Sequence, residues 1–141
     1  MGTISKDFSY REFEASGIAK KKGICNVITT TSVRDAIYQL VIEVLQPLRD
    51  AWGEPLHVNS GYRCRELNEI VGGVPTSQHI KGEAADIAAD NPYELARLAR
   101  NLKLPYDQMI LYPTFVHFSH KLNGEQRGQI LYNKSYKGER L

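Results

Sequence analysis

The sequence predicts an α+β fold in which an antiparallel sheet packs against helices. Apolar residues recur at steps of three and four between Val33 and Trp52, which is typical of a helix with one buried face. Short segments of strand character gather in the C-terminal third of the chain, from Gln108 onwards. Helical segments come mainly before these strands and do not alternate regularly with them. This order favours α+β over a doubly wound parallel sheet.

Length and composition are those of one globular domain. The chain has 141 residues, 42% of them apolar and 24% charged, so we expect residues 1–141 to fold as a single, monomeric unit. A net charge of +2 provides no broad basic surface, and we predict no nucleic-acid partner. The longest apolar run, Met109–Tyr112, is far shorter than the ~20 residues of a membrane helix, so we expect no membrane partner.

The residue inventory limits the kind of metal site that the chain can build. Cys25 and Cys64 are too few for a disulfide scaffold or a four-thiolate zinc site. Histidine and carboxylate side chains would therefore have to bind most of any metal ion. The first ten residues lack a charged start followed by an apolar stretch, so we expect no signal peptide.

The N-terminal region predicts one short helix and a loop. Ser9 and Glu12 have the spacing of a capping box, which indicates a helix directly after Ser9. The segment 17–30 mixes glycine, lysine and threonine and is typical of a loop.

The strongest local signal is the long amphipathic helix that follows. Thr31 or Ser32 can cap its start and Gly53 can end it. Pro47 lies inside the helix and predicts a kink or an early end. The predicted buried face consists of Val33, Ala36, Ile37, Leu40, Val41, Val44, Leu45, Leu48 and Trp52.

The middle of the chain alternates between strand and helix. Leu56–Asn59 reads as a strand, 64–71 as a short helix closed by two glycines, and Ala84–Ala89 as a buried strand. A cap, a first-turn proline and a third-position acid then predict a helix over 91–103.

The C-terminal part predicts three strands. Gln108–Tyr112 and Phe115–His120 flank Pro113-Thr114, and Gly128–Asn133 follows. Asn123-Gly124 is a dipeptide typical of a hairpin turn.

One carboxylate stands out in this pattern. Asp86 lies in the middle of the apolar strand Ala84–Ala89, where an ionised carboxylate is costly unless it is paired or binds a metal. His79 lies in the turn-rich segment before this strand, and Gly82 lets the chain turn tightly between them. An imidazole and a carboxylate together supply two ligands of a divalent metal. The alternative is that Asp86 forms an ion pair with Arg63.

The third ligand would come from the Phe115–His120 strand. Strand alternation puts His117 and Ser119 on one face and His120 on the other, so both histidines cannot point into one site of a regular strand. We assign the ligand to His117, which lies in mid-strand. Two histidines and one aspartate with an open fourth position are typical of a catalytic zinc site.

Three segments carry a resemblance to a known family, namely Ser60-Gly61-Tyr62-Arg63, Ser77-x-His79-x-x-Gly82-x-Ala84-x-Asp86 and Val116-His117-Phe118-Ser119. With these segments the chain resembles the M15 family of zinc peptidases, in particular its short M15A-type domains. The family contains D-Ala-D-Ala carboxypeptidases and dipeptidases and the peptidases of phage endolysins. The resemblance covers roughly residues 30–133.

The resemblance implies a small α+β fold shared with the Hedgehog signalling domain. It also implies a Zn²⁺ ion held by His79, Asp86 and His117. Arg63 would face the site, where its guanidinium stabilises an oxyanion or binds a substrate carboxylate. Ser77 and Gln78 would line the substrate cleft.

The general base of the reaction is missing from its expected position. Many relatives carry an acid or a histidine a few residues before the last zinc ligand, whereas this chain has Thr114 there. A threonine cannot take up a proton at neutral pH. Candidate replacements are Asp107, then His120, then Glu83, although alternation directs Asp107 and His120 away from the site.

Tyr112 is predicted to share the face of the last ligand. If Pro113-Thr114 is a two-residue hairpin turn, Tyr112 pairs with Phe115 and Ile110 pairs with His117. We assign Tyr112 to substrate binding. A phenol with a pKa of about 10 is a poor base, but it can act as an electrophilic donor.

Two functions follow from these assignments. The first is a zinc peptidase that hydrolyses peptidoglycan stem peptides, as a DD-carboxypeptidase or an endolysin-type endopeptidase. The second, favoured by Thr114, is a catalytically impaired zinc-binding module that attaches to cell walls or belongs to a phage. Without a signal peptide, we expect the protein to be cytoplasmic, phage-delivered or released on lysis.

Overall fold

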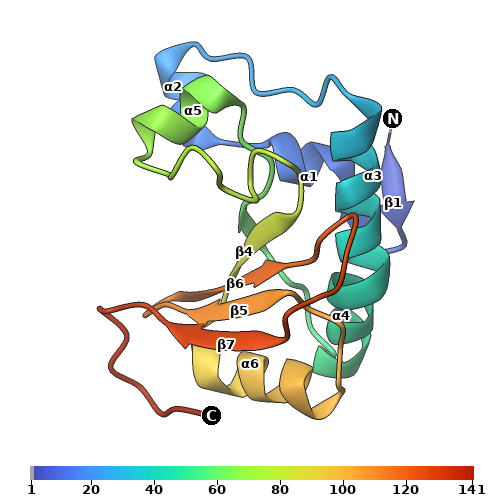
Figure 1. Ribbon diagram of the computed structural model, residues 1–141, viewed down its shortest axis with the longest axis vertical. Coiled ribbons are helices and arrows are strands. Elements are labelled where there is room, and N and C mark those ends of the chain that lie inside the picture. Colours follow the sequence, from blue (N-terminus) through green and yellow to red (C-terminus); the bar gives the residue numbers. More distant parts are fainter. Residues whose placement is uncertain (1) are drawn as a thin grey trace.

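A computed structural model describes residues 2–141, and it confirms the predicted α+β class (Figure 1). The helices are α1 (Tyr10–Glu14), α2 (Gly17–Lys22), α3 (Thr31–Leu40), η1 (Val41–Leu45), α4 (Gln46–Trp52), α5 (Arg65–Ile70) and α6 (Pro92–Asn101). The strands are β1 (Thr3–Ser5), β2 (Phe8–Ser9), β3 (Val58–Ser60), β4 (Ala84–Ala88), β5 (Gln108–Leu111), β6 (Phe115–Ser119) and β7 (Gln129–Tyr132). None of the described helices is long and apolar enough to cross a membrane.

The long helix forms as predicted, and its irregularity lies just before Pro47. α3, η1 and α4 follow one another without a break, and η1 is a π-helical turn. Proline lacks an N–H, and its ring collides with the carbonyl four residues earlier, so a widened turn relieves the clash. Gly53 ends the helix in the left-handed conformation, at φ 80°. The N-cap is Thr30, one residue earlier than predicted.

The predicted loop over 17–30 is wrong in its first part, because residues 17–22 form α2. The Ser16 hydroxyl caps this helix by accepting a hydrogen bond from the N–H of Ala19, and Gly23 ends it at φ 69°. The three lysines of its last turn lie where a helix favours positive charge. Local capping therefore outweighs the loop-like composition. The β1–β2 pair was not expected from the sequence.

The main sheet has five strands in the order β3-β4-β6-β5-β7. All its pairs are antiparallel except β5–β7, which is parallel. The hairpin predicted at Asn123-Gly124 is therefore wrong. β6 already has β4 on one edge and β5 on the other, so the next strand cannot pair with β6, and it adds to the free edge of β5. The chain leaves β6 at the end where β5 begins, and it therefore enters β7 parallel to β5.

The two faces of the sheet differ in character. Alternate residues of β4, β5 and β6 are buried and belong to one core with the long helix and α6: Ala85, Ile87, Met109, Leu111, Val116 and Phe118. The residues between them, on the opposite face, include Asp86 and His117. The apolar face therefore holds the sheet in place, and the other face is left for polar side chains.

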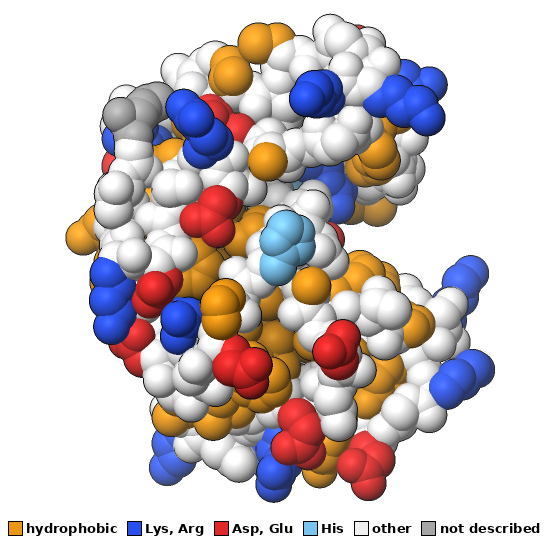
Figure 2. All heavy atoms as spheres, turned by 180° about the vertical axis from the view of Figure 1, so that it is seen from behind, with side chains coloured by type: hydrophobic (Ala, Val, Ile, Leu, Met, Phe, Trp, Pro, Cys, Tyr) orange, Lys and Arg blue, Asp and Glu red, His pale blue; other side chains and the backbone are white. Residues whose placement is uncertain are grey.

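A hollow lies beside this second face. In Figure 1, α2 and α5 lie together and apart from the strands β5, β6 and β7. Figure 2 shows from the opposite side that the surface is notched between these two parts of the molecule. A cavity of about 420 Å³ between α2 and α5 is lined by Lys21, Ser60, Arg63 and Leu67, among others. The sheet thus presents its polar face near open space.

Leu40 tests the packing of the long helix, because its side chain is fully buried in the core. We expect Leu40→Ala to lower the free energy of unfolding by about 2–5 kcal/mol, through lost apolar burial and the cavity that remains. Urea denaturation measures this difference. Leu102→Ala is the matched control, since Leu102 is 41% exposed. Equal stabilities of the two variants would contradict the assigned helix face.

Candidate metal centre

The centre of the site is a pair of residues that face each other across β4 and β6. The Cα atoms of Asp86 and His117 are register partners. Nδ1 of His117 lies 2.9 Å from Oδ1 of Asp86. Asp86 is buried and His117 is half-buried. Ladder pairing between two strands therefore sets the separation of these two groups, as expected from their mid-strand positions.

His79 is brought to the pair by the turns before β4. Its Nε2 lies 3.4 Å from Oδ1 of Asp86. The carbonyl of Gly61 accepts a hydrogen bond from Nδ1 of His79 at 2.7 Å, which leaves the Nε2 lone pair free for a metal. Gly82 passes close to α3 with φ 77°, and a Cβ at this position would lie 2.6 Å from the carbonyl oxygen of Val33. Glycine is therefore required there to let the loop that carries His79 pack against α3.

The three side chains fit a zinc ion. Their donor atoms all lie within 4.8 Å of one another. Ligands bound at 2.0–2.2 Å in a tetrahedron lie about 3.4 Å apart, close to the 3.4 and 2.9 Å measured from Asp86 Oδ1. Two imidazole nitrogens and one carboxylate oxygen are a donor set that zinc prefers. The predicted cofactor, Zn²⁺, therefore suits the residues present.

The neighbours of Asp86 keep its carboxylate ionised. Burial alone would raise the pKa of Asp86, but hydrogen bonds from His117 and His79 outweigh that effect and hold the pKa well below its usual range. The carboxylate therefore stays ionised, which is the form that binds a metal.

Arg63 completes the surroundings of Asp86. Its Nη2 lies 3.8 Å from Oδ2 of Asp86. Burial lowers the pKa of Arg63, and the negative charge of Asp86 opposes that shift. The two alternatives for Asp86, metal ligand and partner of Arg63, thus involve different oxygens of one carboxylate. Both interactions can exist together.

Ser60, from the segment that carries the resemblance, and Asn68, which the sequence did not single out, hold Arg63 in place. Its Nε donates to the hydroxyl of Ser60 at 3.2 Å, and its Nη1 donates to Oδ1 of Asn68 at 3.0 Å. Asn68 is buried and also donates to the carbonyl of Val74. A Cβ at Gly73 would lie 2.1 Å from Oδ1 of Asn68, so this asparagine fits only against a glycine. No spacing rule in the sequence marks Asn68.

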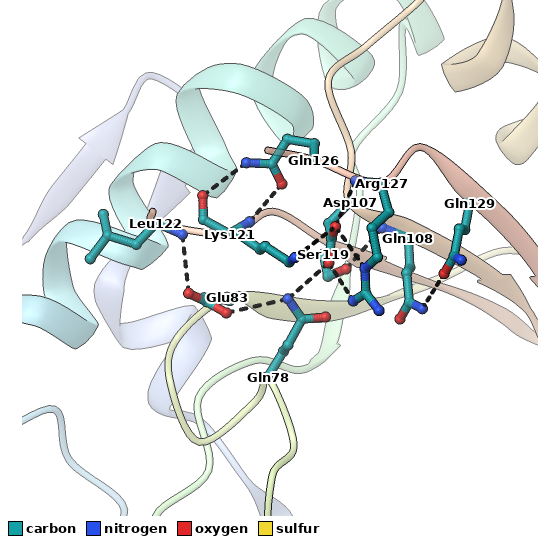
Figure 3. A network of polar contacts seen from close by, with 10 residues as sticks. All are labelled: Gln78, Glu83, Asp107, Gln108, Ser119, Lys121, Leu122, Gln126, Arg127 and Gln129. Atoms are coloured by element: carbon teal, nitrogen blue, oxygen red, sulfur yellow. Dashed lines mark hydrogen bonds and ion pairs between the residues drawn. The ribbon is translucent and has the colours of Figure 1, made fainter. Parts of the chain in front are cut away.

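Asp107, the first candidate base, is bound by other groups (Figure 3). Arg127 donates to Oδ1 from its backbone N–H at 2.8 Å and from Nε at 3.0 Å, and to Oδ2 from Nη2 at 2.6 Å. Burial would raise the pKa of Asp107, but these hydrogen bonds lower it to about 2. Such a carboxylate is a weak proton acceptor. The basic role of Asp107 stays a prediction, and its contacts favour a structural role. Arg127 is a further residue that no sequence pattern indicated.

Gln78 and Glu83 belong to the same network (Figure 3). Nε2 of Gln78 donates to Oε1 of Glu83 at 3.3 Å and to Oδ2 of Asp107 at 3.2 Å. Oε2 of Glu83 accepts a hydrogen bond from the N–H of Leu122. Ser77 accepts one from the N–H of His79. These contacts join the loop of His79 to the segment after β6, while the predicted substrate contacts of Ser77 and Gln78 stay predictions.

His120, the second candidate base, lies just beyond the end of β6 and is buried. Its N–H donates to the carbonyl of Glu83, and its Nδ1 has no hydrogen-bond partner among the described residues. Burial lowers the pKa of His120, against the charges of Glu43, Glu83 and Asp107. The metal-binding group contains no histidine or carboxylate besides His79, Asp86 and His117. The basic role of His120 also stays a prediction.

Tyr112 lies where the sequence predicts it. Ile110 pairs with His117, and the N–H of Tyr112 donates to the carbonyl of Phe115 at 2.9 Å. This register confirms that Tyr112 is on the face of His117. The pair Tyr112–Phe115 is the next pair on that face, two residues beyond the pair Ile110–His117. Burial raises the pKa of Tyr112, and the charges of Asp86 and Arg63 also act on it, which agrees with that position.

Comparisons with known proteins agree with this geometry. A family model described as peptidase M15 matches residues 6–120. A zinc D-Ala-D-Ala carboxypeptidase from Streptomyces albus G is 43% identical over 60 residues. These residues are 40% of this chain and 24% of that protein, so the chain is similar to about a quarter of the relative's length. Both matches indicate Zn²⁺ as the metal, and His79, Asp86 and His117 lie close enough together to bind it.

Removal of one ligand tests the metal centre. We expect His79→Ala to lose stoichiometric zinc binding, measured by elemental analysis after dialysis. Zinc should raise the melting temperature of the wild type and not that of the variant, because a bound ion stabilises only the folded state that holds it. His57→Ala is the control, since His57 is exposed and outside the cluster. Full zinc occupancy in His79→Ala would contradict the assignment.

Asp107→Asn tests the structural role of the Asp107–Arg127 pair. Because the folded state depresses the pKa of Asp107 from 3.8 to about 2, the ionised carboxylate contributes stability above pH 4 and loses it as the pH falls toward 2. We expect the variant to be about 2 kcal/mol less stable at pH 7, and the difference to vanish near pH 2. Urea unfolding of the metal-free proteins measures both values. Asp90→Asn, at an exposed site, should show neither effect.

Proposed function

This chain belongs to the peptidase M15 family of zinc metallopeptidases, and we propose that its substrates are the stem peptides of peptidoglycan. One observation carries the proposal: His79, Asp86 and His117 form a three-ligand cluster whose carboxylate also faces Arg63. Three protein ligands leave a coordination position for the reaction, as in catalytic zinc sites. The carboxypeptidase activity in the name of the Streptomyces relative supports a D-Ala-D-Ala bond as the target.

The chain's own residues would prepare this reaction in three ways. A bound zinc ion supplies a Lewis acid that polarises the scissile carbonyl and activates a water molecule. The carbonyl of Gly61 fixes the tautomer of His79, and strand pairing fixes Asp86 against His117. Ser60 and Asn68 orient the guanidinium of Arg63 while its Nη2 makes no hydrogen bond within the described residues.

Arg63 can therefore act on the substrate without losing its position. Its planar donors suit either the C-terminal carboxylate of a stem peptide or the oxygen that becomes negative during hydrolysis. The cavity of about 420 Å³ beside Arg63 also contains Lys21, so the charge there favours an anionic group. This combination supports a carboxypeptidase more directly than an endopeptidase.

One observation favours a second function. The metal-binding group includes no fourth acid or histidine, and Asp107 is engaged by Arg127. A protein that binds zinc and cell-wall peptides without cleaving them is the alternative that this arrangement supports.

A direct assay separates the two functions. We expect the zinc-loaded protein to release D-alanine from a synthetic stem pentapeptide that ends in D-Ala-D-Ala, measured by mass spectrometry. Incubation with purified peptidoglycan, followed by detection of new amino groups, distinguishes internal cleavage from terminal cleavage. His117→Ala should abolish the release, and His57→Ala should keep it. Zinc and peptide binding without any cleavage would establish the binding module instead.

Arg63→Lys tests the role of the guanidinium. Lysine keeps the positive charge but lacks the planar pair of donors. We expect the variant to keep its zinc and to lose at least about 10-fold in kcat/KM on the pentapeptide. Arg97→Lys, on the exposed face of α6, is the matched control. A wild-type rate in Arg63→Lys would contradict the assigned role.

A further inference from the structure

The two carboxylates considered as candidate bases are engaged by other groups. Asp107 accepts hydrogen bonds from Arg127, and both oxygens of Glu83 accept hydrogen bonds. His120, the remaining candidate, is buried just beyond the end of β6. Whichever group moves the proton, hydrogen-bond donors at the metal site can stabilise the negative charge that develops on the carbonyl oxygen.

Tyr112 is placed to be such a donor. The register puts it on the metal face of β5–β6, beside the row formed by Asp86, His117 and Ile110. Its ring stacks on Phe115, with the centroids 4.2 Å apart and the planes 12° from parallel. Phe115 thus supports one face of the Tyr112 ring.

The electrostatic surroundings keep this hydroxyl protonated. Burial raises the pKa of Tyr112, the charge of Asp86 raises it further, and Arg63 lowers it. A phenol of raised pKa is neutral at physiological pH, so its O–H is available to donate a hydrogen bond. Both charges act on Tyr112, in agreement with its place on the metal face of the sheet.

From this geometry, and resting on the proposed function, we propose that the Tyr112 hydroxyl donates a hydrogen bond to the oxygen of the scissile carbonyl, together with Arg63. The two donors share the negative charge of the tetrahedral state. In the reaction, water adds its oxygen to the carbonyl carbon and the C–N bond breaks. One water proton passes to the leaving nitrogen, and the other remains with the new carboxyl group. Tyr112 keeps its own proton throughout.

The same arrangement contributes to catalysis independently of Thr114, which stands where relatives place an acid. A donor to the developing oxyanion lowers the barrier by stabilising the tetrahedral state, while the proton that the leaving nitrogen receives comes from the attacking water. Tyr112 is then a catalytic residue rather than a wall of the substrate cleft.

Tyr112→Phe tests the proposal, because phenylalanine keeps the ring that stacks on Phe115 and removes only the hydroxyl. We expect kcat for D-alanine release to fall about 10- to 100-fold, with KM, zinc content and melting temperature unchanged. Tyr38→Phe is the matched control, since Tyr38 is 44% exposed on α3. An unchanged kcat, or a loss that lies entirely in KM, would overturn the catalytic role.

A binding measurement keeps the test independent of turnover. A phosphinate analogue of D-Ala-D-Ala imitates the tetrahedral state, and calorimetry measures its affinity for the zinc-loaded proteins. We expect Tyr112→Phe to bind this analogue at least about 10-fold more weakly than the wild type and Tyr38→Phe. Equal affinities would overturn the proposal. If the wild type cleaves no stem peptide, the proposed function fails, while the phosphinate comparison still decides whether Tyr112 is a donor.

Discussion

The buried carboxylate of Asp86 is the constraint on which the rest of the site depends. It lies in the middle of a sheet whose other face forms the core, where an unpaired negative charge would be strongly unfavourable. Its two oxygens face different partners: Oδ1 faces His79 and His117, and Oδ2 faces Arg63. Asp86 therefore positions the two histidines and the guanidinium of Arg63 at once, and the loops that carry His79 and Arg63 converge on it.

Hydrogen bonds outside the ligand cluster hold those loops in place. The N–H of Arg63 donates to the carbonyl of His79, so the two segments are joined by backbone as well as by the side chains around Asp86. On the other side, Gln78 links the His79 loop to the buried carboxylate of Asp107, with which the exposed Arg127 pairs. Asp107, the first candidate base, makes contacts typical of an anchor, because its carboxylate accepts three hydrogen bonds from Arg127.

Much of the fold and of the candidate site could be predicted from the sequence. The period of the apolar residues located the long helix, and Pro47 marked its π-helical turn. The ligands could be proposed because an acid in an apolar strand needs a partner, and alternation selected His117 over His120. The remainder could not be predicted. The composition of residues 17–30 is typical of a loop, so α2 was not predicted. The dipeptide Asn123-Gly124 indicated a turn, but not the strand edge to which the next strand would add.

What the sequence by itself determined is the set of local choices: which residues turn inward, which faces are apolar, and which side chains can bind a metal. These follow from periods of 3.6 and 2 and from the chemistry of single residues. Only the tertiary structure decided the pairings between distant segments. Asn68 and Arg127 acquire their roles from their partners Arg63 and Asp107, and Tyr112 reaches the metal face through the pairing of β5 with β6. No local pattern in the sequence encodes which of these residues will meet.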